Sequence, residues 1–321
     1  MIIPDTFGHI LVTGGAGFIG SHIVDDLLEM RKKVTVFDNL TSGRYEFLKQ
    51  HLKNPNFKLV QGDLLKEEDL HQAFLGRIDS VIHLAANPDI SKGIKDPTLD
   101  FEQTIIATFN SLMKMKEKKI KKIIYFSGSV VDGDVGDKFT TENFGPLLPV
   151  SMYGASKLSA EALISAFSHL FDIQAWIFRP ANIVGDRVTH GVVFDFIKKL
   201  KENPLELTIL GDGNQSKSYL YIRDVLDAIW IALSKTNEQI NIFNIASKSF
   251  VTVNEIAKIV IEALKLENVQ IHHTGGKIGW PGDIPVVRIE NKKINDLGWQ
   301  PKFSSFEAVR KTAEACKGEL V

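Results

Sequence analysis

The side chains that most directly indicate chemistry are Tyr153 and Lys157, which lie four residues apart in the sequence. On a helix, residues at this spacing share one face. A lysine charge beside the phenol favours the phenolate, so the pair predicts a tyrosine whose pKa falls from its reference value of about 10 and which acts as a general base. In a chain with this much lysine, two exposed side chains could show the same spacing. The rest of the sequence therefore decides the interpretation.

A glycine-rich loop near the N-terminus predicts a cofactor site. An apolar segment at residues 10–12 leads into the loop Thr13 to Ser21, and an amphipathic helix follows. Because Gly14 and Gly17 lack Cβ atoms, backbone N–H groups can approach a pyrophosphate at the helix N-terminus, while Gly20 lets the helix and the strand come close. This order of strand, loop and helix predicts dinucleotide binding.

Asp38 ends the next predicted strand and indicates which dinucleotide binds. A carboxylate at this place can bind both ribose hydroxyls, and it would repel a 2′-phosphate. The next residue is Asn39 rather than an arginine that could hold such a phosphate. The sequence therefore predicts NAD as the cofactor, in preference to NADP.

Short β-branched segments alternate with amphipathic segments up to Arg179, after which loops rich in Gly, Pro and Asn separate the helices. This alternation predicts an α/β fold, with a Rossmann-like doubly wound parallel sheet and a smaller C-terminal α/β substrate lobe. We expect an NAD-binding domain at 1–179, to which 218–247 return, and a substrate-binding lobe at 180–217 and 248–321. Strands are expected at 10–12, 34–37, 57–60, 81–84, 123–126 and 175–178, and helices at 18–30, 65–74, 104–118, 153–171, 193–201, 224–233 and 253–264.

Composition excludes several classes of protein. The 321 residues carry 38 basic and 39 acidic side chains, a net charge of -1, so no basic field favours nucleic acid or anionic lipid as a partner. No apolar segment reaches the length of a membrane span, and no secretory signal pattern opens the sequence. The single cysteine, Cys316, excludes an internal disulfide framework. We expect a cytoplasmic enzyme with no metal site and no membrane partner.

With these features together, the chain resembles the extended short-chain dehydrogenase/reductase family, and within it the UDP-glucose 4-epimerase-like enzymes of nucleotide sugars. The similar motifs occur in the family's order over nearly the whole chain. They are Thr13 to Ser21, Asp38 to Leu40, Gly62 to Leu64, His83 to Ala86, Tyr153 to Lys157, Arg179 to Asn182, Gly211 to Gly213, Tyr221 to Asp224 and Leu297 to Trp299.

The resemblance implies roles for many residues of this chain. It implies a 4-epimerase of UDP-hexoses, packed as a homodimer through the helices at 104–118 and 153–171. Tyr153 and Lys157 would be catalytic, and Lys157 would also hold the nicotinamide ribose. The NAD site would comprise Gly14, Gly17, Phe18, Ile19, Gly20, Asp38, Asn39, Ser42, Gly43, Asp63, Leu64, Leu84, Ala85, Ala86, Tyr153, Lys157 and Pro180. The nucleotide sugar would bind to Asn182, His190, Val192 and Lys217, with Lys217 at a position where the family usually has an arginine on the diphosphate.

The sequence departs from the family pattern beside the catalytic pair. The family places a Ser or Thr five residues before a closing glycine, to bond the reacting sugar hydroxyl. Counting back from Gly133 places Gly128 there. The hydroxyl is therefore missing or has moved to Ser127 or Ser129, of which Ser129 is favoured as the third catalytic residue.

The same segment discriminates between reactions. Related dehydratases carry an Asp-Glu pair after that hydroxyl, and related decarboxylases keep the glutamate, whereas this chain has Ser129 and Val130. The resemblance therefore implies epimerisation through a transient 4-keto sugar. The alternatives are a net nucleotide-sugar dehydrogenase or reductase and a non-catalytic NAD-binding regulator.

Two departures concern the substrate. Trp280 replaces an arginine that in the family contacts the diphosphate, and Lys277 or Arg288 could compensate for it. Val287 stands where a bulky aromatic side chain restricts the sugar 2-substituent in some epimerases. This smaller residue indicates room for an N-acetyl group, so the expected substrates are UDP-glucose and UDP-galactose or the N-acetylated pair.

Overall fold

The computed structural model describes residues 3–4 and 6–318 of the chain. Two compact units can be distinguished by their internal contacts. The first comprises the described residues up to Gly128 together with Met152–Arg179 and Ile229–Phe243. The second comprises Ser129–Ser151, Pro180–Ala228 and the described residues from Asn244 onward.

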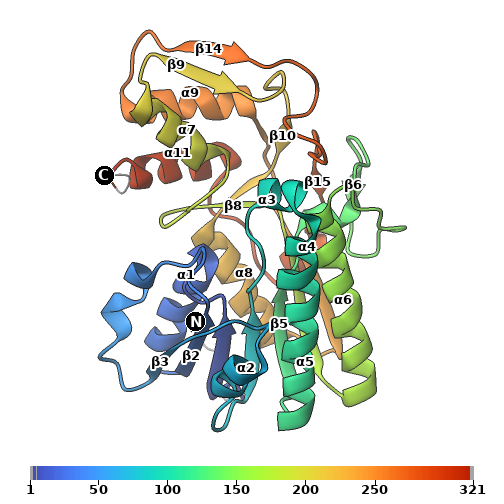
Figure 1. Cartoon of the computed structure of the whole chain (residues 1–321). Coiled ribbons are helices and arrows are strands. Elements are labelled where there is room, and N and C mark those ends of the chain that lie inside the picture. The colour runs from blue at the N-terminus through green and yellow to red at the C-terminus, as the bar shows by residue number, and fades with distance from the viewer. Residues whose placement is uncertain (1–2, 5, 319–321) are drawn as a thin grey trace. The chain divides into compact units, whose positions relative to one another are not determined.

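A seven-stranded sheet forms the centre of the first unit (Figure 1). Its strand order is β12-β7-β5-β4-β1-β2-β3, and the ladders from β7 to β3 are parallel. The order reverses between β1 and β4, which is the place where doubly wound sheets bind ligands beyond the carboxyl ends of their strands. The predicted Rossmann-like fold is confirmed. The strands are β1 (His9–Thr13), β2 (Lys33–Asp38), β3 (Phe57–Gln61), β4 (Ser80–His83), β5 (Lys122–Phe126), β7 (Gln174–Pro180) and β12 (Ile240–Ile245).

Helices cover both faces of this sheet, which is why its strands are nearly continuous apolar segments. On one face, α2, α5 and α6 bury a cluster that includes Leu70, Leu112 and Ile164. On the other, the indole N–H of Trp230 in α8 donates to Asp26 of α1 at 2.6 Å. The helices are α1 (Phe18–Glu29), α2 (Glu67–Ala73), α3 (Ile90–Lys95), α4 (Pro97–Asp100), a π-helix (Phe101–Ile106), α5 (Ala107–Lys118), α6 (Met152–Phe171) and α8 (Ile222–Lys235), with short 3-10 turns at Tyr45–Phe47 and Lys49–His51.

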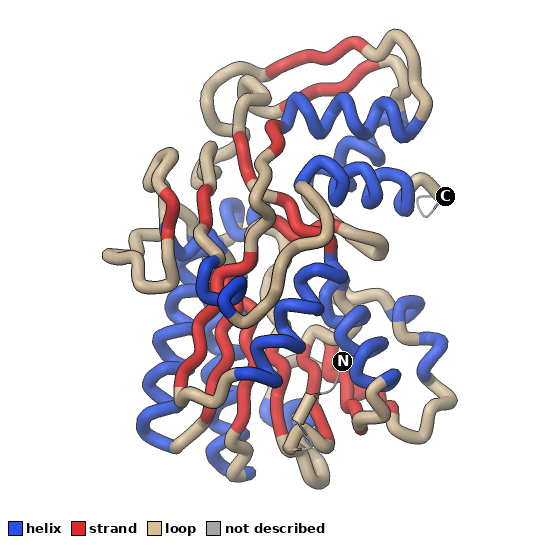
Figure 2. The backbone as a smooth tube through the Cα atoms, turned by 180° about the vertical axis from the view of Figure 1, so that it is seen from behind, coloured by secondary structure: helices blue, strands red, loops and turns tan. Residues whose placement is uncertain are grey.

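In its described residues, the second unit consists mainly of the helices α7, α9 and α11 and four pairs of short strands. Helices α7 (Val192–Glu202), α9 (Val253–Leu264) and α11 (Ser305–Cys316) pack together (Figure 2). The strands pair as β8 (Asn182–Val184) with β11 (Tyr219–Tyr221), β9 (Glu206–Ile209) with β14 (Gln270–His273), β10 (Ser216–Lys217) with β13 (Val251–Thr252), and β6 (Phe139–Thr140) with β15 (Arg288–Ile289). A 3-10 turn (Ser129–Asp132) and α10 (Lys292–Asp296) complete the unit.

The boundaries of the units differ from the expected domains at three segments. Residues 129–151, 218–228 and 244–247 were expected with the dinucleotide-binding part, but they belong to the second unit. The pairing of β6 with β15 and of β11 with β8 accounts for the first two, because each pair joins one of these segments to another part of the second unit.

Among the helices of residues 3–4 and 6–318, none combines the length and the apolar character that a membrane span requires.

Candidate active site

The glycine loop brings the carboxyl ends of β1 and β4 close together. Gly14 has a φ of +69°, and a Cβ added to it would lie 2.8 Å from the backbone nitrogen of Ala85. A Cβ at Gly20 would collide with the carbonyl oxygen of Gly14. Gly14 and Gly20 therefore cannot carry side chains, because β1, β4 and the start of α1 approach one another too closely at these positions.

Helix α1 begins directly after this loop with Gly17 as its N-cap, and no side chain caps it. The first N–H groups of a helix have no partner within the helix, and the helix dipole favours an anion there. Phe18, Ile19 and Gly20, all predicted to contact the cofactor, form this first turn. The loop and the uncapped turn together fit a pyrophosphate.

Asp38 lies at the carboxyl end of β2, beside the glycine loop. Its two carboxylate oxygens accept hydrogen bonds from the backbone N–H groups of Ala16 (2.9 Å) and Leu40 (2.8 Å). Burial raises the pKa of this carboxyl group, while those two bonds oppose the rise. A Cβ at Gly43 would press against the carboxylate, so glycine is the residue that fits there. The carboxylate is thus held where the ribose of a dinucleotide would lie in this fold.

The other residues predicted to contact the cofactor follow neighbouring strands. Asp63 and Leu64 follow β3, where an oxygen of Asp63 accepts from Leu65 N–H at 3.0 Å. Leu84 follows β4, and its N–H donates to Thr13 at 3.1 Å. The remaining members of the set are Asn39, Ser42, Gly43, Ala85, Ala86 and Pro180, which lie at or just after the ends of β2, β4 and β7.

Tyr153 and Lys157 lie in the first turns of α6, and the structure brings their side chains together. The Lys157 ammonium lies 5.7 Å from the centroid of the Tyr153 ring and 5.3 Å from that of Tyr125. Its Nζ donates a hydrogen bond of 2.9 Å to the carbonyl oxygen of Phe126, at the end of β5. Lys157 is only 4% exposed, so its position is fixed by the sheet edge.

The electrostatics of this pair differ from what the sequence predicts. Burial raises the pKa of Tyr153 to about 12, and the negative charge of Asp100 contributes to the rise. Burial also lowers the pKa of Lys157 to about 8. The sequence predicts that Lys157 lowers the pKa of Tyr153, and for the protein without cofactor this prediction is wrong. The loss of solvation on burial raises the pKa of the phenol by more than a lysine charge at this distance lowers it.

The two candidate serines have different surroundings. The Ser127 hydroxyl is buried and has no hydrogen-bond partner among the described residues, while the Ser127 backbone N–H donates to Phe178 at 2.8 Å. Ser129, which the sequence favours, is also buried and begins the 3-10 turn Ser129–Asp132 of the second unit.

The residues predicted to bind substrate all lie in the second unit. Asn182 of β8 is in register with Tyr219 of β11. His190 lies just before α7, and Val192 is the first residue of that helix. Val287 precedes β15, and its N–H donates to Ser216 at 3.3 Å.

Lys217 is paired within the protein. Its Nζ lies 2.7 Å from an oxygen of Asp283, whose side chain is buried, and 5.7 Å from the centroid of the Trp280 ring. Asp283 therefore orients Lys217, and Lys217 lies close to Trp280, the residue at the position where the resemblance implies an arginine.

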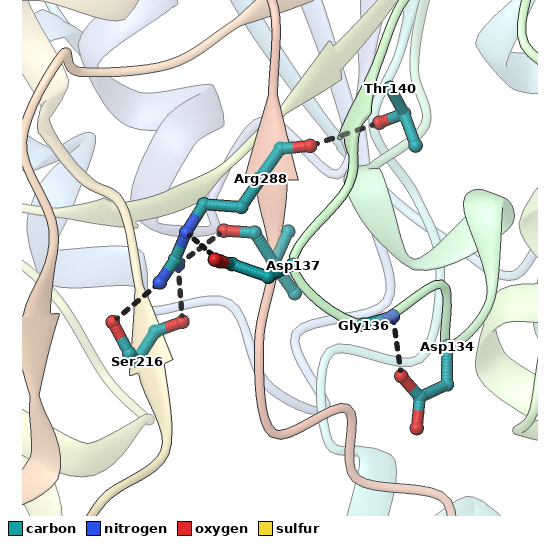
Figure 3. Close-up of polar contacts among 7 residues, drawn as sticks. Asp134, Gly136, Asp137, Thr140, Ser216 and Arg288 are labelled. Carbon is teal, nitrogen blue, oxygen red and sulfur yellow. Dashed lines mark hydrogen bonds and ion pairs between the residues drawn. The ribbon is translucent and has the colours of Figure 1, made fainter.

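Arg288, one of the two candidates to compensate for that arginine, is fully engaged by the protein (Figure 3). Its Nε pairs with Asp137 at 2.9 Å, Nη1 donates to the carbonyl oxygens of Ser216 and Val287, and Nη2 donates to the Ser216 hydroxyl. The guanidinium also lies 3.9 Å from the centroid of the Phe250 ring. Arg288 therefore holds β15 to β10 and to the loop before β6, and this use of its donors argues against a diphosphate contact. Lys277, the other candidate, is exposed.

The structure also brings charged residues to the catalytic pair that the sequence did not indicate. Asp100 ends α4 and is 1% exposed, and Glu161 of α6 forms a buried ion pair with Arg179 of β7 at 2.6 Å. His83 of β4 is fully buried between the hydroxyls of Thr13 and Thr108. No local pattern marks Asp100 as buried, because it lies in the four-residue helix α4, which is too short to show an apolar periodicity. Within the described ranges, no three His, Cys, Asp or Glu side chains are placed to hold a metal ion.

Comparison with known proteins connects this geometry to a family. The family model for NAD-dependent epimerases and dehydratases matches residues 10–246. The chain is 33% identical to a putative UDP-glucose 4-epimerase of Methanocaldococcus jannaschii, over 96% of this chain and 98% of that protein. It also matches the crystal structure of a UDP-glucose 4-epimerase of Thermotoga maritima with UDP-glucose, at a TM-score of 0.87 and 32% identity, covering 98% of this chain and 100% of the other.

Relatives with other chemistry are nearly as similar. A dTDP-D-glucose 4,6-dehydratase of Bos taurus is 29% identical over 97% of this chain and 89% of that protein. Overall similarity therefore identifies NAD-dependent enzymes of nucleotide sugars without separating epimerases from dehydratases.

Proposed function

Because the chain belongs to the NAD-dependent epimerase/dehydratase family, we propose that it is a nucleotide-sugar 4-epimerase that acts through a transient 4-keto sugar. The observation that supports this most directly is the Tyr153–Lys157 pair on α6, held at the end of β5 in the same unit as the glycine loop. The expected substrates are UDP-glucose and UDP-galactose, or their N-acetylated counterparts.

In this proposal Tyr153 accepts the proton of the sugar 4-hydroxyl and later returns it. When bound at the glycine loop, NAD⁺ would supply the hydride acceptor for C4 and, once reduced, the hydride donor, and its ring charge would favour the phenolate of Tyr153. Lys157 supports the same protonation state with its ammonium group, and the hydroxyl of Ser127 or Ser129 passes the proton from the sugar to the phenol. If the keto sugar turns over before hydride and proton return, the C4 epimer results with no net oxidation.

The proposal favours epimerisation over water loss because of two residues. Ser129 and Val130 occupy the positions where, by resemblance, a dehydratase carries its Asp-Glu pair. Neither side chain can exchange the additional proton that elimination of water requires. The side chain of Val287 leaves more space than an aromatic ring, which supports acceptance of a 2-acetamido group.

The test is a substrate panel with two readouts. Purified protein is incubated with each of the four UDP-sugars, the products are separated by chromatography, and NADH absorbance is followed in parallel. We expect the C4 epimer to form without accumulation of NADH. Steady NADH release would indicate a net dehydrogenase, a 4-keto-6-deoxy product would indicate a dehydratase, and retention of NAD without any turnover would indicate a regulator.

We also propose a homodimer formed through α5 and α6. Phe109 and Met113 on α5 are 40% and 41% exposed, and Leu170 on α6 is 72% exposed. Large apolar side chains gathered on two neighbouring helices favour contact with another protein surface.

A further inference from the structure

Lys157 is a buried cation, and among residues 3–4 and 6–318 no carboxylate lies at ion-pair distance from its Nζ. It is 4% exposed, and its Nζ donates a hydrogen bond to the neutral carbonyl oxygen of Phe126. A buried ammonium without a partner loses much of its preference for the charged form. Some other negative charge must therefore support the protonated lysine.

Asp100 is a buried carboxylate whose hydrogen bonds satisfy only one of its two oxygens among the described residues. It is 1% exposed, and one carboxylate oxygen accepts a hydrogen bond of 2.9 Å from the side-chain amide of Asn87. The other oxygen, Oδ2, has no hydrogen-bond partner among the described residues. A Cβ on Gly93 would occupy the place of Oδ2, so the missing side chain at this position of α3 makes room for the carboxylate.

The fold places this carboxylate beside the catalytic helix. Asp100 ends α4 and Gly93 lies in α3, and both short helices pack against α6, which carries Tyr153 and Lys157 (Figure 1). Burial raises the pKa of Asp100, while the hydrogen bond from Asn87 and the charge of Lys157 oppose that rise. Burial lowers the pKa of Lys157, and the charge of Asp100 opposes this change. Burial raises the pKa of Tyr153, and the charge of Asp100 adds to this rise.

The other groups that face Lys157 do not supply this charge. Glu161 also favours the protonated lysine, but Arg179 neutralises it through contacts of 2.6, 3.0 and 3.2 Å. Burial lowers the pKa of His83 to about 3 and raises that of Tyr125 well above its ordinary value, so both are neutral at physiological pH.

We propose that Asp100 is a positioning residue for the proposed epimerisation, whose buried carboxylate keeps the Lys157 ammonium charged and restrains ionisation of Tyr153. The inference rests on the proposed function for the role of the pair. The proposal adds the charge of Asp100 on α4 to the side chains of Tyr153 and Lys157 on α6. It also gives a reason why a carboxylate with an oxygen lacking a partner among the described residues is buried beside α6.

The test measures the titration of Lys157 directly, in the full-length protein with NAD bound. Lysines are labelled with ¹³C at Cε, the chemical shift of Lys157 is followed against pH by NMR, and the signal is assigned by its loss in Lys157→Met. Asp100→Asn keeps the size of the side chain and an oxygen that can accept from Asn87. In this variant we expect the titration midpoint of Lys157 to fall by about half a pH unit or more, because an opposite charge nearby typically shifts a pKa by about one unit or more.

Asp26→Asn is the matched control. Asp26 is another buried aspartate that accepts from a side-chain N–H, in this case that of Trp230, and the Asp26→Asn variant should leave the Lys157 midpoint unchanged. An unchanged or raised midpoint in Asp100→Asn would overturn the proposal. If Asp100→Asn does not fold, Asp100→Ser replaces it. Failure of both to fold while Asp26→Asn folds would assign Asp100 to folding and would also overturn the proposal.

The titration needs no turnover, so it separates this inference from the proposed function. If the wild-type protein epimerises no UDP-sugar, the proposed function fails while the Lys157 midpoints still decide the role of the Asp100 charge. If it does epimerise, both limbs of the pH profile of kcat should move to lower pH in Asp100→Asn. Removing the anion makes both the ammonium and the phenol lose their protons more readily, so the limbs move together.

Discussion

At the scale of single residues, burial decides the chemistry of the catalytic pair. With a pKa of about 12, the Tyr153 phenol is almost wholly protonated at neutral pH and so rarely available to accept a proton. With a pKa of about 8, Lys157 loses its charge only slightly above neutral pH. The pair therefore depends on charges beyond its own two side chains. Asp100 acts on the lysine in the protein, and the positive ring of NAD⁺ would act on the phenol. In the proposed mechanism, such an arrangement would make proton transfer depend on cofactor binding.

Replacing Tyr153 by Phe should remove the proton acceptor. We expect kcat to fall by roughly a hundredfold to ten-thousandfold, the usual contribution of a general acid–base group, while NAD stays bound. The measurement is epimer formation under saturating UDP-sugar, together with the NAD content of the purified protein. Tyr45→Phe, which alters an exposed tyrosine, is the control and should behave like the wild type. Activity near the wild-type level in Tyr153→Phe would remove the tyrosine from the mechanism.

The two serines can be separated by their alanine variants. The Ser127 hydroxyl is buried without a hydrogen-bond partner among the described residues, as expected for a group whose partner is the bound substrate. We therefore expect Ser127→Ala to lower kcat by about tenfold or more and Ser129→Ala to lower it less, since a relay group contributes part of the acid–base effect. Steady-state kinetics of both variants decide the question. The opposite order would restore Ser129, which the sequence favours.

At the scale of elements, the proposed cofactor site lies where the ends of several strands come together. β1 ends in the glycine loop, β2 ends at Asp38, and β4 ends at the residues that contact Gly14. None of these segments could bind a dinucleotide alone. The parallel sheet brings them to one edge, and the absence of a side chain at Gly14 lets β1 and β4 meet there.

Gly14→Ala tests this close approach. The substitution adds both backbone strain at a φ of +69° and a contact of 2.8 Å with the Ala85 backbone. Gly76→Ala is the matched control, because Gly76 has a φ of +79° but nothing within 4 Å of the added Cβ. We expect Gly76→Ala to cost about 1 kcal/mol of unfolding free energy and to retain NAD. Gly14→Ala should cost more and lose NAD, as measured by chemical denaturation and by NAD content. Equal effects would show that close packing at the loop is unimportant.

At the scale of the whole molecule, the chain passes repeatedly between its two units. Residues 129–151 leave the first unit after β5 and return to it at α6, and the chain crosses again after β7, within α8 and within β12. Tyr153 therefore follows directly on a segment of the second unit. That segment is attached to later parts of the chain by Arg288, which binds Asp137, and by the pairing of β6 with β15.

Association of two copies is also a property of the whole molecule. Met113→Glu places a charge among the exposed apolar residues of α5 and should convert the proposed dimer to a monomer, because burying an unpaired carboxylate in the interface is unfavourable. Light scattering coupled to size-exclusion chromatography would measure the molar mass. Leu205→Glu, which alters an exposed leucine of the second unit, should leave the mass unchanged. A wild-type monomer would contradict the proposed dimer.

The sequence by itself determined the features that depend on neighbouring residues. Strand and helix periodicity predicted six of the seven strands of the sheet and most of its helices closely enough to identify the fold, because side-chain spacing reflects the geometry of each element. The edge strand β12 (Ile240–Ile245) was not predicted. The glycine loop, Asp38 and the Tyr153–Lys157 spacing could also be recognised locally. Helix α11 was missed although a capping box, with Ser304 and Glu307 bonding each other's backbone N–H groups, marks its start.

Only the tertiary structure decided the features that depend on burial and on contacts between distant segments. The pKa values of Tyr153 and Lys157 follow from desolvation and from Asp100, which lies more than fifty residues away in the sequence. Arg288 was a candidate ligand in the sequence, and its contacts with Asp137 and Ser216 assign its donors to the protein. A residue's type and spacing fix which interactions it can make, whereas its solvation and its partners are fixed only when the chain is folded.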